Sequence, residues 1–267
     1  MHQPILSENR HPRLLIFCGA GISADSGIST FRDADGLWEN YNVDVVANAR
    51  TWKANYGTVH EFYNARRAGV AAAQPNLMHR AIADWQKRYD TTILTQNIDD
   101  LLERAGCVDV VHLHGRVNSM VCQACGESFD VDPGTPWRAG EDTCPKCPCR
   151  GAIKPGVVFF EEEAPEYRRM FREFRYLARG DVLLVLGTSG KVIDIGTYAS
   201  GMAAYTILSN LESADAEWSP YAPSVRDDQF NIALHGRAVQ TAPRLDHLLR
   251  ALLGDGNDPA LPDDDHD

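Results

Sequence analysis

The sequence contains no apolar run that approaches the roughly 20 residues needed for a membrane-spanning helix. Its first 12 residues also lack the apolar core of a secretory signal peptide. We therefore expect a cytoplasmic protein without a membrane partner. Positive charge is scarce as well: 26 Lys and Arg residues are outnumbered by 37 Asp and Glu, giving a net charge of −11. This charge disfavours direct binding to nucleic acid.

Apart from these absences, the composition is ordinary for a globular protein. The 267 residues are 44% hydrophobic and 24% charged, so the chain can bury a substantial core. Residues 254–267 are rich in Gly, Pro and Asp, and we expect them to form a disordered acidic tail. The sequence leaves the oligomeric state open, and a monomer is compatible with it.

Seven cysteines are present, and five of them lie between Cys122 and Cys149. Cys122 and Cys125 form one C-x-x-C pair, and Cys144 and Cys147 form another 18 residues later. This spacing predicts a structural zinc ribbon with four thiolate ligands rather than disulfides. The pairs 144/147 and 144/149 are both alternatives for the second half of the site, and we favour Cys147 because the C-P-K-C knuckle is compact.

Strand-like apolar segments alternate with helical patterns along most of the chain. This alternation predicts an α/β fold, a Rossmann-like parallel sheet with helices on both faces. The expected strands are 13–18, 91–94, 108–111, 181–186 and 205–209. The expected helices are 58–68, 76–87, 99–105, 165–178, 193–203 and 243–252. Two segments leave the alternation, and we expect them to form a smaller inserted lobe: a helical module at 37–75 and a zinc-ribbon module at 118–155.

The first expected strand ends in Gly19-Ala20-Gly21. Closely spaced glycines after a strand are how dinucleotide-binding folds bring backbone N–H groups against a pyrophosphate, because glycine has no Cβ. Ala24 stands at the third position of this pattern, which the G-x-G-x-x-G/A form allows. By itself the pattern is equally typical of a tight turn.

Further polar clusters follow the other strands, at the edge where open α/β sheets bind ligands. TQNID occupies 95–99, HLHG 112–115, GTSG 187–190 and NLE 210–212. Together with GAGIS at 19–23 and FRDADGLW at 31–38, these motifs occur in the order found in sirtuins. From about residue 14 to about 252, the chain resembles this family of NAD-dependent protein-lysine deacylases.

The resemblance implies a discontinuous NAD-binding domain formed by 13–36, 76–117 and 156–253, with NAD and the acyl-lysine meeting between it and the smaller lobe. NAD would be a co-substrate, and one structural Zn²⁺ would be bound. Cys149 lies where many sirtuins place the last zinc cysteine, so it remains an alternative ligand. The implied NAD contacts are Gly19, Ala20, Gly21, Ile22, Ala24, Phe31, Arg32, Trp38, Gln96, Asn97, Ile98, Asp99, His114, Gly187, Thr188, Ser189, Asn210, Glu212 and Ala238.

By the same resemblance, three residues would be catalytic. The histidine before the glycine of HLHG is the general base in sirtuins, and here it is His114, whose imidazole suits proton abstraction near neutral pH. Asn97 and Asp99 would hold the nicotinamide ribose and contact the carboxamide pocket. An Asx turn that caps the following helix would also explain these two side chains. We interpret His112 as structural.

The implied reaction begins when the acyl-lysine carbonyl oxygen attacks C1′ of the nicotinamide ribose. After nicotinamide leaves, His114 helps to deprotonate a ribose hydroxyl. The products are free lysine, nicotinamide and O-acyl-ADP-ribose. Two alternatives are a protein mono-ADP-ribosyltransferase, which uses the same nicotinamide cleavage, and a non-catalytic NAD-sensing adaptor. The presence of His114 and Asn97 favours the deacylase.

The acyl-lysine protein or peptide would bind along residues 155–162, which resemble the family strand that pairs with the substrate backbone. Val158 and Phe159 would flank the acyl-lysine. Glu161 replaces the glycine of the usual F-G-E, and Asp194 replaces the proline of the later V-x-P. These departures concern the peptide preference and leave the NAD motifs intact.

Tyr63 and Arg66 are three residues apart, so they share one face of an expected helix. Such a pair can hold a carboxylate through a phenolic hydrogen bond and a guanidinium fork. Sirtuins that remove succinyl and malonyl groups carry this pair, and Ala34 matches their small residue at the pocket wall. We therefore expect desuccinylation and demalonylation beside deacetylation, whereas a solvated helix face is the alternative.

Overall fold

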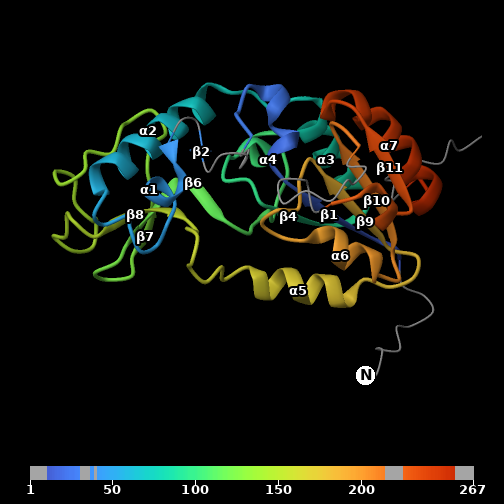
Figure 1. The fold of residues 1–267 in the computed structure, drawn as a ribbon. Helices are drawn as coiled ribbons and strands as arrows, with labels where there is room; N and C mark the ends of the chain where they lie inside the picture. The colour runs from blue at the N-terminus through green and yellow to red at the C-terminus, as the bar shows by residue number, and fades with distance from the viewer. Residues whose placement is uncertain (1–10, 31–36, 39–40, 214–224, 256–267) are drawn as a thin grey trace, which may run out of the picture.

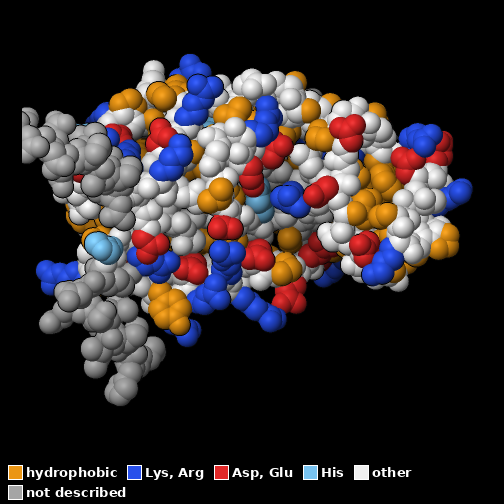
Figure 2. Space-filling model, turned by 180° about the vertical axis from the view of Figure 1, so that it is seen from behind, with side chains coloured by type: hydrophobic (Ala, Val, Ile, Leu, Met, Phe, Trp, Pro, Cys, Tyr) orange, Lys and Arg blue, Asp and Glu red, His pale blue; other side chains and the backbone are white. Residues whose placement is uncertain are grey.

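The computed structural model describes residues 11–30, 37–38, 41–213 and 225–255. Figure 1 shows a large parallel sheet with helices on both faces, and beside it a smaller group of elements that contains β2, β6, β7, β8, α1 and α2. No helix in these ranges is both long and apolar enough to cross a lipid bilayer. Acidic and basic side chains are interspersed on the face shown in Figure 2.

Six strands of the described chain form the large sheet, in the order β5-β4-β1-β9-β10-β11 with every pair parallel. This is the doubly wound order of dinucleotide-binding folds, and its direction reverses between β1 and β9. Ligands bind at such a switch point, outside the carboxyl ends of the strands. The strands are β1 Arg13–Cys18, β4 Asp90–Thr95, β5 Val111–His112, β9 Val182–Leu186, β10 Tyr205–Asn210 and β11 Ile232–His235.

Side chains alternate between the two faces of the sheet along each strand, and helices cover both faces, so both are buried. In β1, Leu14 and Ile16 pack with α3 and α7, whereas Leu15 and Phe17 pack with α5 and α6. The helices are α3 Leu77–Arg88, α4 Leu101–Arg104, α5 Tyr167–Tyr176, α6 Ile195–Ser200 and α7 Ala238–Leu253. Short 3-10 turns are η1 Ala20–Ile22, η2 Ala24–Ser26 and η3 Asp227–Gln229.

The smaller group is built on an antiparallel sheet in the order β7-β6-β8. Helix α2 packs on this sheet through Val59 and Phe62, which share a core cluster with Val117 and Val157. The elements are β2 Leu37–Trp38, β3 Tyr41–Asn42, α1 Val43–Val46, α2 Tyr56–Ala72, β6 Gly115–Cys122, β7 Ser128–Asp130 and β8 Ile153–Val157.

The predicted fold class is confirmed, but several element boundaries differ from the prediction. Helix α7 begins at Ala238, five residues before the predicted start at Pro243. Pro243 cannot donate a backbone hydrogen bond, yet burial of Leu245 and Leu249 stabilises the helix around it. The strand predicted at 108–111 is reduced to β5, since Asp109 adopts a left-handed φ of 52°. The division into domains stays a prediction, and tail residues 256–267 lie outside the described part of the chain.

Candidate functional site

The loops after β1 and β9 meet at the switch point through glycine backbone. Gly21 donates its N–H to the carbonyl of Gly187 over 2.8 Å. A Cβ built on Gly21 would lie 2.6 Å from the Gly187 Cα, which no side chain can tolerate. These glycines are therefore required by the close approach of the two loops, independently of any ligand.

Three polar side chains connect the strand ends at this edge. Gln96 Nε2, after β4, donates to Thr188 Oγ1, after β9, over 2.9 Å. Asn210, at the end of β10, accepts the N–H of Thr188 at 3.1 Å and donates to its carbonyl at 3.0 Å. The carboxyl ends of β4, β9 and β10 are thus fixed relative to one another.

A cavity of about 700 Å³ opens over this edge and brings the predicted NAD and acyl-lysine residues together. The predicted site residues that line it are Gly19, Ala20, Gly21, Tyr63, Arg66, Gln96, Asn97, Ile98, Asp99, His114, Val158, Phe159, Gly187, Thr188, Ser189, Asn210 and Glu212.

Three other predicted NAD contacts do not line the cavity. Ile22 is fully buried in the core of the large sheet, Ala24 is exposed beside it, and Ala238 packs at the start of α7. The side chain of Ile22 points into the core because η1 turns immediately after β1. Phe31, Arg32, Ala34 and the side chain of Trp38 lie outside the described residues.

Asn97 and Asp99 are buried and joined through Ser23. The Ser23 hydroxyl donates to Asp99 Oδ2 at 3.0 Å and accepts from Asn97 Nδ2 at 3.3 Å. His79 Nδ1 accepts the N–H of Asn76, so its Nε2 carries the hydrogen and donates to Ser23 Oγ at 3.3 Å. Burial lowers the pKa of His79 to about 4 and raises the pKa of Asp99. This hydrogen-bond chain fixes the orientation of the Asp99 carboxyl group.

Two further contacts complete the turn that contains Asn97 and Asp99. Asp99 Oδ1 accepts the N–H of Leu101 at 3.1 Å, so Asp99 forms an Asx turn onto the first residue of α4, whose N-cap residue is Asp100. His112 Nδ1 lies 2.8 Å from the Asn97 carbonyl, and its Nε2 lies 2.6 Å from Glu103 Oε1. These contacts fit the structural role expected for His112.

His114 presents one ring nitrogen to the cavity. Its Nδ1 lies 3.1 Å from the Gln96 carbonyl, which can only accept, so Nδ1 carries the hydrogen. Nε2 is therefore the acceptor nitrogen, and it lies 2.9 Å from the Tyr167 hydroxyl. Burial lowers the pKa of His114, opposed by the Gln96 hydrogen bond, so the imidazole is neutral at neutral pH. A neutral imidazole can take a proton at Nε2 once this nitrogen is no longer hydrogen-bonded to Tyr167.

The segment after β8 forms the opposite wall of the cavity. The N–H of Val158 bonds to the His114 carbonyl at 2.9 Å, and the N–H of Phe160 bonds to the Ala47 carbonyl at 2.8 Å. The buried Lys154 ammonium pairs with Glu162 at 2.8 Å, and Glu162 also accepts the N–H of Phe159 at 2.9 Å. The segment is thus fixed at both ends.

Tyr63 and Arg66 reach the same cavity from α2. Tyr63 is fully buried and its ring stacks on Phe159, with centroids 5.8 Å apart. Burial raises the pKa of Tyr63, and the nearby Arg66 charge opposes this effect. Arg66 donates to the Ser29 carbonyl at 3.4 Å. The helix face that carries this pair is therefore buried against the cavity, which excludes the alternative of a solvated helix face.

Four cysteine sulfurs gather at the end of β6 and in the loops beside the smaller sheet. Those of Cys122, Cys125, Cys144 and Cys147 all lie within 4.8 Å of one another, with Cys122–Cys147 and Cys125–Cys144 each 3.7 Å apart. A tetrahedron of thiolates about 2.3 Å from zinc has S···S edges of about 3.8 Å, so the four residues fit this ion. The backbone carbonyl of Cys149 accepts a hydrogen bond from the N–H of Cys144. The grouping matches the favoured prediction, and metal binding itself stays a prediction.

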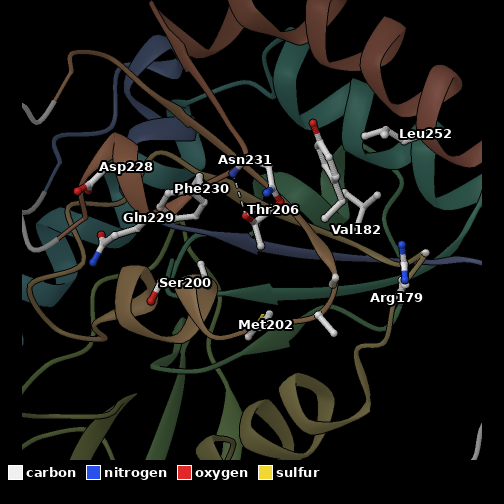
Figure 3. A pocket seen from close by; sticks show the side chains of 15 residues that line it. Arg179, Val182, Ser200, Met202, Thr206, Asp228, Gln229, Phe230, Asn231 and Leu252 are labelled. Carbon is white, nitrogen blue, oxygen red and sulfur yellow. Dashed lines mark hydrogen bonds between the residues drawn. The ribbon is translucent and has the colours of Figure 1, made fainter.

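A second cavity, of about 610 Å³, lies at the opposite edge of the large sheet, beside the first residues of β9 and β10. Figure 3 shows that Asn231 and Thr206 in this cavity point toward each other. Asn231 Oδ1 accepts both the N–H and the hydroxyl of Thr206, at 2.8 and 3.1 Å. These polar groups satisfy one another, and the candidate site is the first cavity.

Sequence reasoning missed Ser23, His79 and Tyr167 as parts of the site. Ser23 lies inside the GAGIS motif, and that position was the available signal. His79 gave a weaker signal through the Asn76-x-x-His79 spacing of a helix N-cap. Tyr167 gave none, because only the packing of α5 brings it to His114.

Comparison with known proteins agrees with this geometry. A model described as the Sir2 family matches residues 19–194, more than half of the chain. A protein of Helicobacter hepaticus named NAD-dependent protein deacylase is 37% identical over 260 residues, which cover 89% of this chain and 97% of that protein. A Mycolicibacterium smegmatis protein, named NAD-dependent protein deacylase Sir2, is 40% identical over 245 residues, covering 90% of this chain and 98% of that protein.

Solved structures agree as well. The crystal structure of a Sir2 homolog–NAD complex has a TM-score of 0.73 at 32% identity, covering 90% of each chain. A Sir2 homologue mutant in complex with ADP ribose has a TM-score of 0.75 at 31% identity, covering 90% of this chain and 93% of that one. Because the family model matches more than half of the chain and these relatives are 37–40% identical over most of its length, the chain belongs to the Sir2 family.

Proposed function

We propose that this protein is an NAD-dependent protein-lysine deacylase. The observation that carries the proposal is a single cavity that His114, the strand-end NAD motifs and the segment after β8 line together. The names of the curated relatives, NAD-dependent protein deacylase, support the same activity. The proposed substrates are acylated lysines of cytoplasmic proteins.

Each part of the cavity has a role in this proposal. NAD supplies the ribose that receives the acyl group. The backbone around Gly19 and Gly21 would face the pyrophosphate, and Asn97 and Asp99 would orient the nicotinamide ribose. His114 would take the proton of a ribose hydroxyl at Nε2. A zinc bound by four thiolates has no open position, so its role would be structural.

The test is His114→Ala with an acetylated peptide and NAD. We expect formation of O-acyl-ADP-ribose to fall by roughly 10²-fold or more, the scale of lost general-base catalysis, while NAD binding remains. His247→Ala is the matched control, because His247 is exposed on α7, away from the cavity lining. Near-normal turnover by the His114 variant with zinc bound would remove this residue from the mechanism. ADP-ribosylated protein in place of O-acyl-ADP-ribose would favour the transferase.

We further propose that the enzyme removes succinyl and malonyl groups. The support is that Arg66 and Tyr63 line the same cavity as His114 and Phe159. A carboxylate that enters this partly desolvated space needs a cationic partner, since an unpaired buried charge is costly. Arg66 offers that partner. The corresponding experiment compares acyl groups on one peptide and is given in the Discussion.

A further inference from the structure

The hydroxyl of Tyr167 forms a hydrogen bond with the acceptor nitrogen of His114. Tyr167 is the first residue of α5, and its oxygen lies 2.9 Å from His114 Nε2. The two rings are 5.9 Å apart between centroids. Met170 and Phe174 anchor α5 in the core beneath the sheet, so the helix holds Tyr167 in this place. Tyr167 also lines the cavity itself.

The direction of this hydrogen bond follows from the other side of the ring. His114 Nδ1 donates to the Gln96 carbonyl, so Nε2 carries only a lone pair and the Tyr167 hydroxyl must donate to it. Burial raises the pKa of Tyr167, which keeps the phenol protonated and able to donate. A donor at Nε2 stabilises the neutral imidazole relative to the charged form.

The present inference rests on the proposed role of His114 as general base. The hydrogen bond from Tyr167 conflicts with that role. A general base must lie within hydrogen-bond reach of the proton that it takes. The single lone pair of Nε2 cannot accept from Tyr167 and from a ribose hydroxyl at once. We propose that Tyr167 is a positioning residue: it holds His114 in its neutral, Nδ1-protonated form in the free protein and leaves Nε2 when the ribose hydroxyl of NAD arrives.

Other titratable groups share the cavity with His114. Besides His114 and Tyr167, the charged or titratable side chains that line the cavity, from every element around it, are Tyr63, Arg66, Asp99, Glu161, Glu162, Lys191 and Glu212. Substitution of Tyr167 by phenylalanine leaves all of them in place. It keeps the ring contact with Phe171, whose centroid lies 6.4 Å away, and removes only the hydroxyl.

The experiment is a titration of the His114 ring by ¹⁵N NMR in wild type and Tyr167→Phe, without and with saturating NAD. The signal is assigned by its loss in His114→Ala. Without NAD, we expect the variant to titrate about 0.4 to 1 pH unit higher, because the donor that favours the neutral ring is gone. With NAD, both proteins should titrate at the same pH, because Tyr167 no longer contacts Nε2.

Tyr176→Phe, at the exposed end of the same helix, is the control and should match wild type in both states. An equal titration of wild type and Tyr167→Phe without NAD would overturn the inference, and so would a difference that persists with NAD. Thermal unfolding checks that the variant is folded. Absence of NAD binding, or absence of NAD-dependent deacylation by the wild type, would instead overturn the proposed function.

Discussion

Arg66 and Arg67 are adjacent in sequence but have different surroundings. Arg67 is 1% exposed, donates to the Val117 carbonyl at 3.2 Å, and also bonds to Asn64. Burial lowers its pKa to about 10. Arg66 instead lines the cavity with Tyr63. At the scale of single residues, one arginine therefore joins α2 to β6, whereas its neighbour lines the cavity.

Replacing Arg66 should change the choice of acyl group. We expect Arg66→Met to lower kcat/KM for a succinylated peptide about 10- to 150-fold, the cost of losing a charge-assisted contact. Acetyl-lysine has no carboxylate, so its kcat/KM should change little. Tyr63→Phe should show the same bias more weakly. The measured quantity is the ratio of the two kcat/KM values in wild type and variants. An equal loss of both activities would show that Arg66 is structural.

At the scale of elements, the segment after β8 shows how a departure from the family pattern is accommodated. Glu161, where sirtuins usually have glycine, has a left-handed φ of 68°. Its carboxylate pairs with Arg50, and both side chains are solvent-accessible. An exposed ion pair contributes at most about 1 kcal/mol, which is comparable to the cost of a left-handed residue.

Two variants of Glu161 separate these effects. Glu161→Ala and Glu161→Gly both lose the ion pair with Arg50, but only glycine adopts the left-handed conformation without strain. We expect the glycine variant to be more stable than the alanine variant by about 1 kcal/mol. Urea unfolding of the two proteins measures this difference. Equal stability, or a more stable alanine variant, would show that the backbone there is not strained.

The zinc ribbon is a second element whose ligand set can be tested. We expect one equivalent of zinc in the wild type and in Cys149→Ser, and loss of zinc in Cys147→Ser. Removing the metal should unfold the smaller sheet and abolish activity indirectly, because few apolar residues besides the cysteines hold this part together. Metal analysis and circular dichroism are the measurements. Loss of metal only in Cys149→Ser would reverse the assignment, and retention in both would refute the ribbon.

At the scale of the whole molecule, buried neutral histidines link stability to pH. His79 lies in the large part of the molecule, and His60 lies between α2 and the smaller sheet, where its Nε2 bonds to the Ile153 carbonyl at 2.9 Å. Burial lowers the pKa of each to about 4, from an ordinary value of 6.5. Between these values the unfolded chain binds more protons than the folded chain, so stability falls as the pH falls from about 6.5 to about 4.

As the pH falls from 7 to 5, each of these histidines should lower the free energy of unfolding by about 2 kcal/mol. His60→Gln keeps a side-chain donor but cannot titrate. We expect its unfolding free energy, from urea melts at the two pH values, to fall about 2 kcal/mol less than that of wild type. An equal fall in both proteins would show that His60 is not the acid-sensitive group.

The sequence by itself determined the α/β class, the two cysteine pairs and the order of the strand-end motifs. These features depend on local periodicity and on short spacings along the chain. Asn97, Asp99 and His114 could be named from the resemblance to sirtuins, and each follows a strand whose end lies at the ligand edge of a parallel sheet.

Only the tertiary structure decided which side chains meet across large sequence separations. Sequence spacing could not show that His79 reaches Asp99 through Ser23, or that α5 places Tyr167 against His114. The structure also shows that the side chain of Ile22 belongs to the core, whereas its implied contact with NAD stays a prediction. The physical reason is that such contacts depend on how helices pack on a sheet, which is set by the sum of many buried apolar contacts rather than by any local pattern.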